Sequence, residues 1–428
     1  MKQPITFAIC GFGNRGRDAY AAYQKQHPDQ MKIVAVAEPV PERLMAARTE
    51  YGVEEAMCFE NAETLLKQPK LADVMIIATQ DRQHIGHALP ALELGYHLLL
   101  EKPISPELKE CVALLDKAHE TGRLVVVCHV LRYTAFFSTL KELIEQGAVG
   151  TVQTLDAVEN VAYYHHAHSF VRGNWRNSAE SCPMILAKSC HDMDMIRYLM
   201  GEPCVRVSSF GRLGHFRREN APAGSAGRCL DCGVRDACPY DAEKIYLTNP
   251  QTGLLNGNVK WPVSVLAHDP TEGKVRQALR EGPYGRCVYR CDNDVVDHQV
   301  VSMEFESGAT ATFTMSAFTQ KCYRTVRVMG SMGELEGDMD LNRITVRRFG
   351  QADQVIDLAA AQGMSGHGGG DEGIMASLCE LVKRNETAAL SSIDASVESH
   401  VMALAAEHSR LNGGQSVELE AFARSAAR

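Results

Sequence analysis

The chain has 428 residues, of which 45% are hydrophobic and 23% charged, a composition typical of soluble globular proteins rather than disordered ones. Its 44 lysines and arginines against 53 aspartates and glutamates give a formal net charge of −9 without a basic block, which argues against a nucleic-acid partner. No window approaches the ~20 apolar residues that cross a bilayer, and the N-terminus lacks a signal-peptide pattern. We therefore expect a cytoplasmic protein of about two to three domains, with no membrane partner.

The first part of the chain, residues 1–130, alternates short apolar strands with amphipathic helices. The strand-like segments are, in chain order, ITFAIC, IVAVAE, ADVMIIAT, HLLLE and RLVVVCHV. Fully apolar strands that alternate with helices indicate a parallel sheet covered by helices on both faces. This pattern predicts an α/β fold for the first domain.

The second part, residues 131–428, follows a different pattern. A helix near residues 134–146 and the strand-like TVQTLDAVEN lead into it, and from about Val295 the sequence alternates with period two between Gly-containing turns. Such alternation predicts a large, mainly antiparallel sheet with one buried face. A long irregular insertion at about 211–292 interrupts this part, and helical patterns return toward the C-terminus.

The strongest single motif is a glycine-rich loop directly after the first predicted strand. Gly11-Phe12-Gly13-Asn14-Arg15-Gly16 follows ITFAIC and opens a helix, which is the setting in which GxGxxG binds a dinucleotide. The glycines permit a tight turn and close approach of the pyrophosphate, which rests on the helix N-terminus. The next strand ends in Glu38, whose carboxylate accepts hydrogen bonds from ribose hydroxyls and repels a 2′-phosphate, so we predict NAD rather than NADP.

Four segments together resemble a known enzyme family. They are the GxGxxG loop, ATQDRQH (Ala78–His84), GYHLLLEKP (Gly95–Pro103) and CHDMDMIRYLMG (Cys190–Gly201). In these segments the chain resembles the Gfo/Idh/MocA oxidoreductases, which include glucose–fructose oxidoreductase and inositol dehydrogenases. The resemblance implies a Rossmann domain, a C-terminal α/β domain whose open sheet forms the interface of a homo-oligomer (a dimer or tetramer), and NAD(P)-linked chemistry on a small carbohydrate substrate.

The resemblance also implies a catalytic pair. Lys102 matches the family's active-site lysine, and at the carboxyl end of a parallel strand it can hold a substrate hydroxyl. His191 matches the histidine of the second domain and suits the role of proton acceptor, while Asp194 lies at i+3 and can orient its ring or cap the helix. The family's usual Asp four residues before this histidine is replaced by Ala187, followed by Lys188, for which we predict an active-site role.

Further candidates follow from the same segments. For the cofactor they are Thr79, His84 and Glu101, beside the loop and Lys102. For the substrate they are Arg132 and Tyr133, at the start of the second domain, Trp175, which can stack on a sugar face or pack in a loop, and His367 in the loop GHGGGD.

The insertion contains a cysteine cluster. Cys229, Cys232 and Cys238 are closely spaced, and Cys287 follows at a distance from which a fourth thiolate can complete a tetrahedral site. Since the insertion has little regular apolar pattern, a metal can supply folding energy that a core does not. We predict a structural zinc ion; an iron–sulfur cluster, reduced buried thiols and incidental disulfides are the alternatives.

These observations predict an NAD-dependent oxidoreductase that transfers hydride from a secondary alcohol of a sugar, glycoside or cyclitol. The alternative is an NAD-dependent glycosidase of the same family, which uses transient oxidation at C3, elimination and water addition. A nucleotide-sensing regulatory protein is the third hypothesis.

Overall fold

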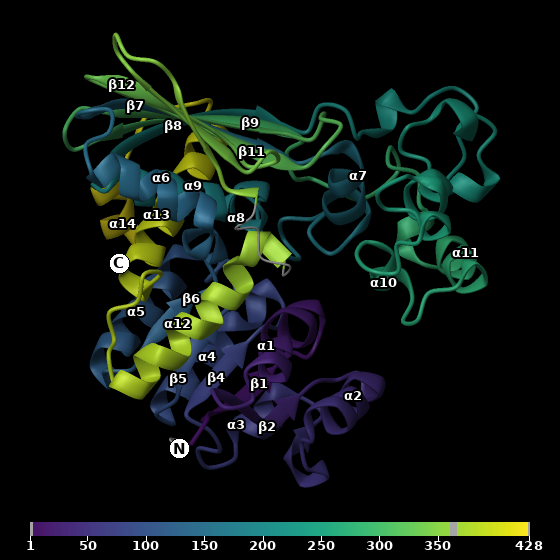
Figure 1. Cartoon of the computed structure of the whole chain (residues 1–428). Helices are drawn as coiled ribbons and strands as arrows, with labels where there is room; N and C mark the ends of the chain where they lie inside the picture. Colours follow the sequence, from purple (N-terminus) through teal and green to yellow (C-terminus); the bar gives the residue numbers. More distant parts are fainter. Residues whose placement is uncertain (1–2, 360–365, 427–428) are drawn as a thin grey trace.

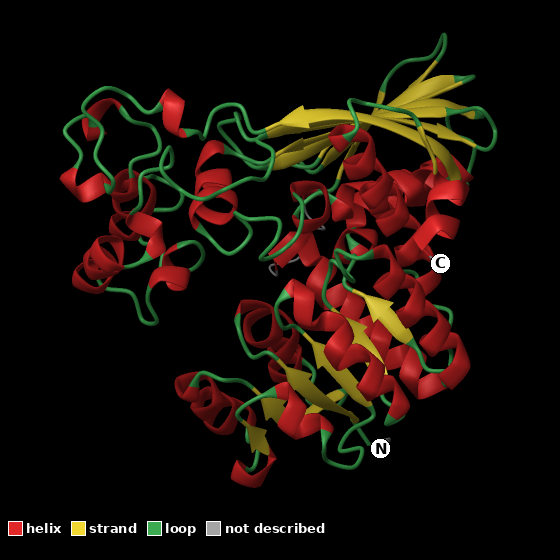
Figure 2. Ribbon diagram, turned by 180° about the vertical axis from the view of Figure 1, so that it is seen from behind, coloured by secondary structure: helices red, strands yellow, loops and turns green. Residues whose placement is uncertain are grey.

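A computed structural model describes residues 3–359 and 366–426 of the chain. Two sheets dominate it, one in the N-terminal part and one in the C-terminal part, with helices packed between them (Figures 1 and 2). The irregular insertion stands beside one end of the larger sheet, away from most of the helices (Figure 1). Both predicted sheet types are confirmed.

The N-terminal sheet has six parallel strands in the order β3-β2-β1-β4-β5-β6. This is the strand order of a Rossmann fold. After β3 the chain crosses over to the other side of β1, where β4, β5 and β6 follow one another. The strands are β1 (Ile5–Cys10), β2 (Met31–Ala37), β3 (Cys58–Phe59), β4 (Val74–Ile77), β5 (His97–Leu100) and β6 (Val125–Val127). Phe7 and Ile9 face one buried cluster, whereas Ala8 and Cys10 face another, so β1 is covered on both sides.

Helices cover both faces of this sheet (Figure 1). They are η1 (Asn14–Ala21), α1 (Ala22–Gln26), α2 (Pro41–Tyr51), η2 (Glu55–Met57), α3 (Ala62–Leu66), η3 (Asp81–Gln83), α4 (His84–Glu93) and α5 (Leu108–Thr121). A helix from much later in the chain, α12 (Gly370–Arg384), also lies against this part, and its Ile374 and Leu378 join the same buried cluster as Phe7. The C-terminal part of the chain therefore returns to complete the core of the nucleotide domain.

The C-terminal sheet has nine strands in the order β14-β13-β12-β11-β7-β10-β9-β8-β15. Its strands are β7 (Val152–Asn160), β8 (Cys204–Arg212), β9 (His298–Phe305), β10 (Thr310–Ser316), β11 (Tyr323–Gly330), β12 (Gly333–Asp338), β13 (Arg343–Arg348), β14 (Gln354–Asp357) and β15 (Val417–Glu418). Only β7 and β10 pair in parallel, so the sheet is mainly antiparallel. Along β9, Val301, Met303 and Phe305 are buried while their neighbours are more exposed, which is the predicted period of two.

Helices cover the buried face of this sheet and connect it to the nucleotide domain (Figures 1 and 2). They are η4 (Val130–Tyr133), α6 (Ala135–Glu145), α7 (Tyr163–His166), η5 (Ala167–Arg172), α8 (Met184–Ala187), α9 (Cys190–Met200), η13 (Gly366–Gly369), α13 (Ile393–Leu411) and α14 (Leu419–Ala426). Within the described ranges, no helix is both long enough and apolar enough to cross a bilayer.

The insertion between β8 and β9 has a core of its own. It consists of short helices: η6 (Arg218–Asn220), η7 (Cys229–Asp231), η8 (Arg235–Ala237), η9 (Lys244–Thr248), η10 (Leu254–Asn256), α10 (Val263–Leu266), α11 (Glu272–Glu281) and η11 (Pro283–Gly285). Phe216, Tyr246 and Leu279 are buried in one cluster together with residues of α7 and η5. The insertion is therefore anchored to the second domain by apolar and aromatic packing.

Candidate active site

The glycine-rich loop joins β1 to η1 at the carboxyl edge of the Rossmann sheet. Gly11 has φ +87°, and a Cβ there would lie 2.4 Å from the carbonyl oxygen of Ala78, so only glycine fits. A Cβ on Gly16 would lie 2.0 Å from the carbonyl oxygen of Gly11, which explains the last glycine of the motif. Gly13 is the residue before the helix, and a Cβ added there would lie 3.6 Å from Arg43 Nη1, which is ordinary contact. The loop therefore has the shape and open backbone that a pyrophosphate requires.

Glu38 follows β2 directly and lies beside the glycine-rich loop. Its carboxylate is almost fully buried and accepts a hydrogen bond from the backbone N–H of Phe12 at 2.7 Å. The Phe12 ring itself is buried and packs edge to face on Tyr51. The second oxygen of Glu38 lies 3.2 Å from Nη1 of the half-exposed Arg43. The carboxylate thus stands beside the loop, where it can bind the ribose hydroxyls of a dinucleotide.

Arg15 ties the loop to two distant segments. Its Nε donates to Glu101 Oε1 at 2.6 Å, and its Nη2 lies 2.7 Å from Asp371 Oδ1 at the start of α12. The Tyr20 hydroxyl also donates to Glu101. Burial raises the pKa of Glu101, but the charges of Arg15 and Lys102 outweigh burial and keep this pKa below its ordinary value. Glu101 therefore remains an ionised anchor between the loop and Lys102, and Asn14 stays at the surface, bonded to Asp18.

Lys102 contacts the segment just before His191, the other residue of the predicted catalytic pair. Its Nζ donates to the carbonyl oxygen of Ala187 at 3.1 Å, at the end of α8. His191 lies in the first turn of α9, four residues further on, and its side chain is largely buried. Burial raises the pKa of Cys190, the residue before His191, to about 12, while the positive charge of Lys102 acts against this rise. The fold therefore brings Lys102, after β5, next to the segment that leads into α9.

Behind His191 lies a buried ion pair. Asp194 accepts two hydrogen bonds from Arg132, at 2.8 and 2.7 Å, and Arg132 also donates to the carbonyl oxygen of Leu390. The ring of His129 packs edge to face on that of His191, with centroids 6.0 Å apart. Burial lowers the pKa of His129 to about 4, so this ring is neutral near pH 7. Arg132 and Asp194, predicted to contact substrate, thus neutralise each other and hold α9 against η4.

Lys188 belongs to a second buried charge cluster, whose other members were not among the predicted site residues. Its Nζ lies 3.3 Å from Glu159 of β7, and Arg324 of β11 lies 2.5 Å from the other oxygen of the same carboxylate. Arg324 also donates to Asp192 at 2.7 and 3.2 Å. Burial lowers the pKa of Lys188, but the charge of Glu159 outweighs burial and holds this pKa above its ordinary value. Lys188 is therefore an ammonium ion fixed beside the segment that Lys102 contacts.

The other predicted residues have different positions. Thr79 lies at the carboxyl end of β4 beside the loop, and its hydroxyl bonds His87 at 3.1 Å. His84 is fully buried, with its ring nitrogens 2.7 and 3.2 Å from the carbonyl oxygens of Pro103 and Thr79, so it supports the loop that bears Lys102. The Tyr133 hydroxyl bonds Ser391, and Trp175 donates its indole N–H to Asp81 at 3.1 Å. His367 falls in η13, and its side chain lies outside the described residues.

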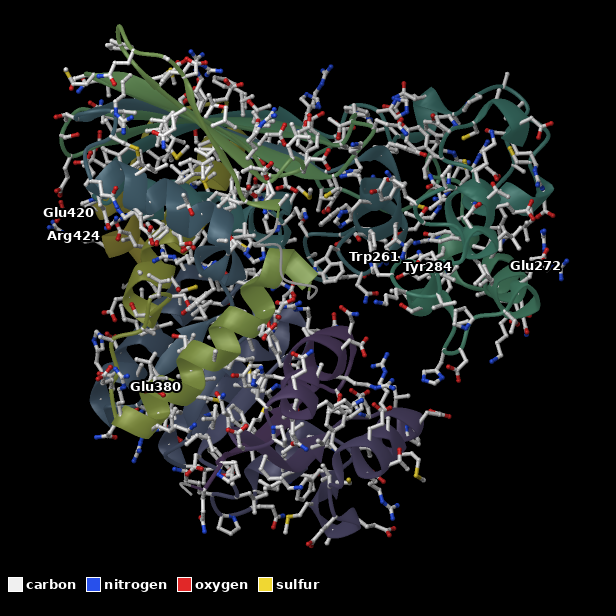
Figure 3. The ribbon with its side chains drawn as sticks, viewed as in Figure 1. Trp261, Glu272, Tyr284, Glu380, Glu420 and Arg424 are labelled. Atoms are coloured by element: carbon white, nitrogen blue, oxygen red, sulfur yellow. The ribbon has the colours of Figure 1, made fainter. Side chains whose placement is uncertain are left out.

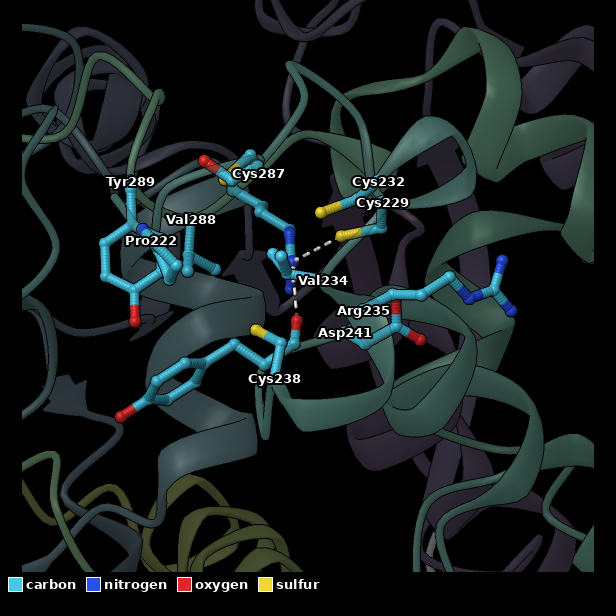
Figure 4. Close-up of a pocket in the computed structure, with 13 residues that line it drawn as sticks. Pro222, Cys229, Cys232, Val234, Arg235, Cys238, Asp241, Cys287, Val288 and Tyr289 are labelled. Carbon is cyan, nitrogen blue, oxygen red and sulfur yellow. Dashed lines mark hydrogen bonds between the residues drawn. The ribbon is translucent and has the colours of Figure 1, made fainter. Parts of the chain in front are cut away.

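The predicted zinc site is not supported. Cys229, Cys232, Cys238 and Cys287 line one pocket of the insertion (Figure 4), but among the described residues no group of three or more His, Cys, Asp or Glu side chains is arranged to hold a metal ion. The buried guanidinium of Arg172 lines the same pocket and donates to Cys229 Sγ at 3.4 Å. The insertion also has an apolar core, so its packing does not depend on a metal ion.

Two models of one known family match this chain. A model described as "Oxidoreductase family, NAD-binding Rossmann fold" matches residues 5–129, and one described as "Oxidoreductase family, C-terminal alpha/beta domain" matches residues 141–419. The chain therefore belongs to the Gfo/Idh/MocA family of oxidoreductases, and its N-terminal sheet is the family's NAD-binding domain.

Individual relatives are distant. The chain is 22% identical over 315 residues to the putative oxidoreductase YteT of Bacillus subtilis, covering 70% of each chain. It is 28% identical over 179 residues to glycosyl hydrolase family 109 protein 1 of Bacteroides fragilis, covering 40% of this chain and 37% of that protein. An inositol dehydrogenase homologue from Azotobacter vinelandii, solved with NADH and myo-inositol, superposes with a TM-score of 0.66 at 16% identity, covering 98% of each chain, which is a likeness of fold.

Proposed function

We propose that this chain is an NAD-dependent dehydrogenase that oxidises a secondary alcohol of a sugar, glycoside or cyclitol. The observation that carries the proposal is the hydrogen bond from Lys102 to Ala187, because it joins the edge of the NAD-binding sheet to the helix start that bears His191. The domains that correspond to these two sides are residues 1–130 and 131–428.

Each side of the site has a distinct role. The loop from Gly11 to Gly16 and Glu38 would hold NAD, which supplies a hydride acceptor when it is bound. Lys102 donates a hydrogen bond to the substrate hydroxyl, and the imidazole of His191 accepts the proton that this hydroxyl loses. Lys188, held by Glu159, adds a fixed positive charge that favours the alkoxide as it forms.

Assembly and location are part of the proposal. The outer face of the nine-stranded sheet exposes Phe210 and Val300, which lie opposite each other on β8 and β9 at 59% and 46% exposure. We propose that this face forms the interface of a homo-oligomer. The described cysteines, all free thiols, fit a reducing compartment such as the cytoplasm.

A redox-neutral glycosidase is the second candidate. Two observations favour it: Ala187 replaces the carboxylate that dehydrogenases of the family carry before the histidine, and one relative is a glycosyl hydrolase of family 109. In that reaction Lys102 and His191 would keep their roles toward the substrate hydroxyl, while the nucleotide would be regenerated within each turnover.

One incubation separates the two. The pure protein is mixed with NAD and a panel of cyclitols, free sugars and nitrophenyl glycosides, and absorbance of NADH and of nitrophenol is followed together. A dehydrogenase accumulates NADH with substrate, whereas the glycosidase releases nitrophenol without net NADH. If neither signal appears and calorimetry detects no binding of NAD or NADH, the proposal fails.

A further inference from the structure

An aromatic side chain of the insertion, Trp261, packs against α7 and η5. Trp261 lies two residues before α10, and it is half-buried. Its ring meets that of His165 edge to face, with centroids 4.7 Å apart, and that of His168 at 5.2 Å. Figure 3 shows Trp261 on the edge of the insertion that faces the rest of the molecule, with Tyr284 behind it. The insertion therefore turns an aromatic surface toward the two sheets.

Trp261 contacts His165, and His165 in turn feels the charge of Lys188, the residue after the one that Lys102 contacts. Burial, and next to it the charge of Lys188, lowers the pKa of His165, so this ring is held neutral. The Nδ1 of His165 also lies 3.6 Å from the thiol of Cys322, directly before β11. Lys188 follows Ala187, the residue that Lys102 contacts. Lys102, Lys188, His165 and Trp261 are all half-buried, so each keeps part of its surface open to a ligand.

The other tryptophan, Trp175, has different contacts from those of Trp261. The sequence has two tryptophans, and the indole N–H of Trp175 is bonded to Asp81 while its ring packs near Phe170. Both tryptophans are half-buried, but Trp175 is bonded to Asp81 of the nucleotide-binding part, whereas Trp261 packs on His165 and His168. An indole face is a large apolar surface, and the C–H face of a pyranose ring packs against such surfaces.

We propose that Trp261 stacks on a sugar ring next to the ring being oxidised, and that it selects glycosides and disaccharides over free monosaccharides and cyclitols. This inference rests on the proposed function. Trp261 packs on His165, whereas Lys102 bonds the residue before Lys188, so a ring held by Lys102 is separated from the indole. A second ring, attached through the glycosidic oxygen, extends past Lys188 and His165 to reach it.

Kinetics of Trp261→Ala and Trp261→Phe test the proposal on a compound that the wild-type protein turns over and on its free monosaccharide or cyclitol counterpart. For the glycoside or disaccharide, we expect kcat/KM to fall roughly ten-fold or more in Trp261→Ala and to recover in Trp261→Phe. For the single-ring counterpart, the change should stay below about two-fold. Equal losses on both compounds, or no loss on either, would overturn the assignment.

Fluorescence supplies a readout that does not depend on turnover. In Trp175→Phe, Trp261 is the sole tryptophan, and in Trp261→Phe the sole tryptophan is Trp175. With NAD present, the two-ring compound should shift the emission of Trp175→Phe at concentrations at which the single-ring counterpart does not, and it should leave Trp261→Phe unchanged. An unchanged emission of Trp175→Phe refutes stacking. Calorimetry with NAD, carried out in parallel, shows separately whether the nucleotide site and thus the proposed function stand.

Discussion

Replacing Glu159 by glutamine tests the buried charge cluster that holds Lys188. Glu159 is fully buried, and its oxygens lie 3.3 Å from Lys188 Nζ and 2.5 Å from Arg324 Nη2. Glutamine has almost the same shape, so the substitution removes one negative charge and little volume. In the variant, Lys188 and Arg324 face a single carboxylate, that of Asp192.

The expected loss in the free energy of unfolding depends on which of the two cations, Lys188 or Arg324, is left without a partner. Breaking a buried ion pair costs about 3–5 kcal/mol, because it leaves an uncompensated charge. Burial raises the pKa of Asp192 to about 7 and Glu159 adds to this rise, so without Glu159 the Asp192 carboxyl ionises more readily and remains a partner of Arg324. The loss therefore falls on Lys188. We expect the free energy of unfolding to drop by roughly 3 kcal/mol, and the pKa of Lys188 to fall, since Glu159 is what raises it.

Urea unfolding followed by tryptophan fluorescence measures this change. Glu334→Gln is the matched control, because its partners Arg327 and Arg347 are at the surface and the loss should stay below about 1 kcal/mol. In the double variant Glu159→Gln with Lys188→Met, the unpaired ammonium is gone, so stability should recover relative to Glu159→Gln. A Glu159→Gln protein as stable as Glu334→Gln, or a double variant less stable than the single one, would refute the reasoning.

Four further predictions concern the rest of the site. Lys102→Met should retain NAD binding by calorimetry and lose about 10²- to 10⁴-fold in kcat; unchanged turnover contradicts its role. Glu38→Ser should raise the ratio of kcat/KM for NADP to that for NAD at least about ten-fold, because the repelling carboxylate is gone and Arg43 stays nearby; a constant ratio contradicts this. Arg172→Met should expose the insertion to limited proteolysis without changing NAD affinity, since its guanidinium joins Cys229 to two backbone carbonyls; parental resistance contradicts this. Burial lowers the pKa of His129 to about 4 in the folded protein, against an ordinary value of 6.5. Stability is therefore highest above pH 6.5, where the ring is neutral in both states, and the free energy of unfolding falls as the pH falls toward 4, by about 2 kcal/mol at pH 5. His129→Gln should accordingly show a smaller drop in Tm between pH 7 and pH 5 than the parent.

The nucleotide domain was predictable because local patterns determine it. Apolar strands such as ITFAIC, each followed by a helical pattern, can only form a parallel sheet with both faces covered, and GxGxxG after the first strand marks the nucleotide edge. The place of α12 in this domain was not predictable, since nothing in its sequence distinguishes a helix that packs on the nearer sheet from one that crosses to the other.

The charge cluster around Lys188 left a partial signal. Glu159 and Arg324 occupy buried positions of strands β7 and β11, so a charged residue interrupts each apolar alternation. Period two shows that each side chain points inward, but only the register of the sheet, in which Arg324 pairs directly with Glu159, shows that the charges meet. The same limit explains Arg132 and Asp194: their positions near the site were predictable, but their mutual neutralisation was not.

The cysteine cluster shows why spacing alone is weak evidence for a metal. Close spacing brings thiols to one pocket, and Cys229, Cys232, Cys238 and Cys287 do line one. What else enters that pocket depends on a residue far away: Arg172 belongs to a helix before α9, whereas the four cysteines follow β8. A buried guanidinium can bond a thiol and backbone carbonyls at once, so it can cross-link an irregular segment much as a metal would. Whether a cysteine-rich insertion needs a metal therefore depends on the cation that the surrounding fold already supplies.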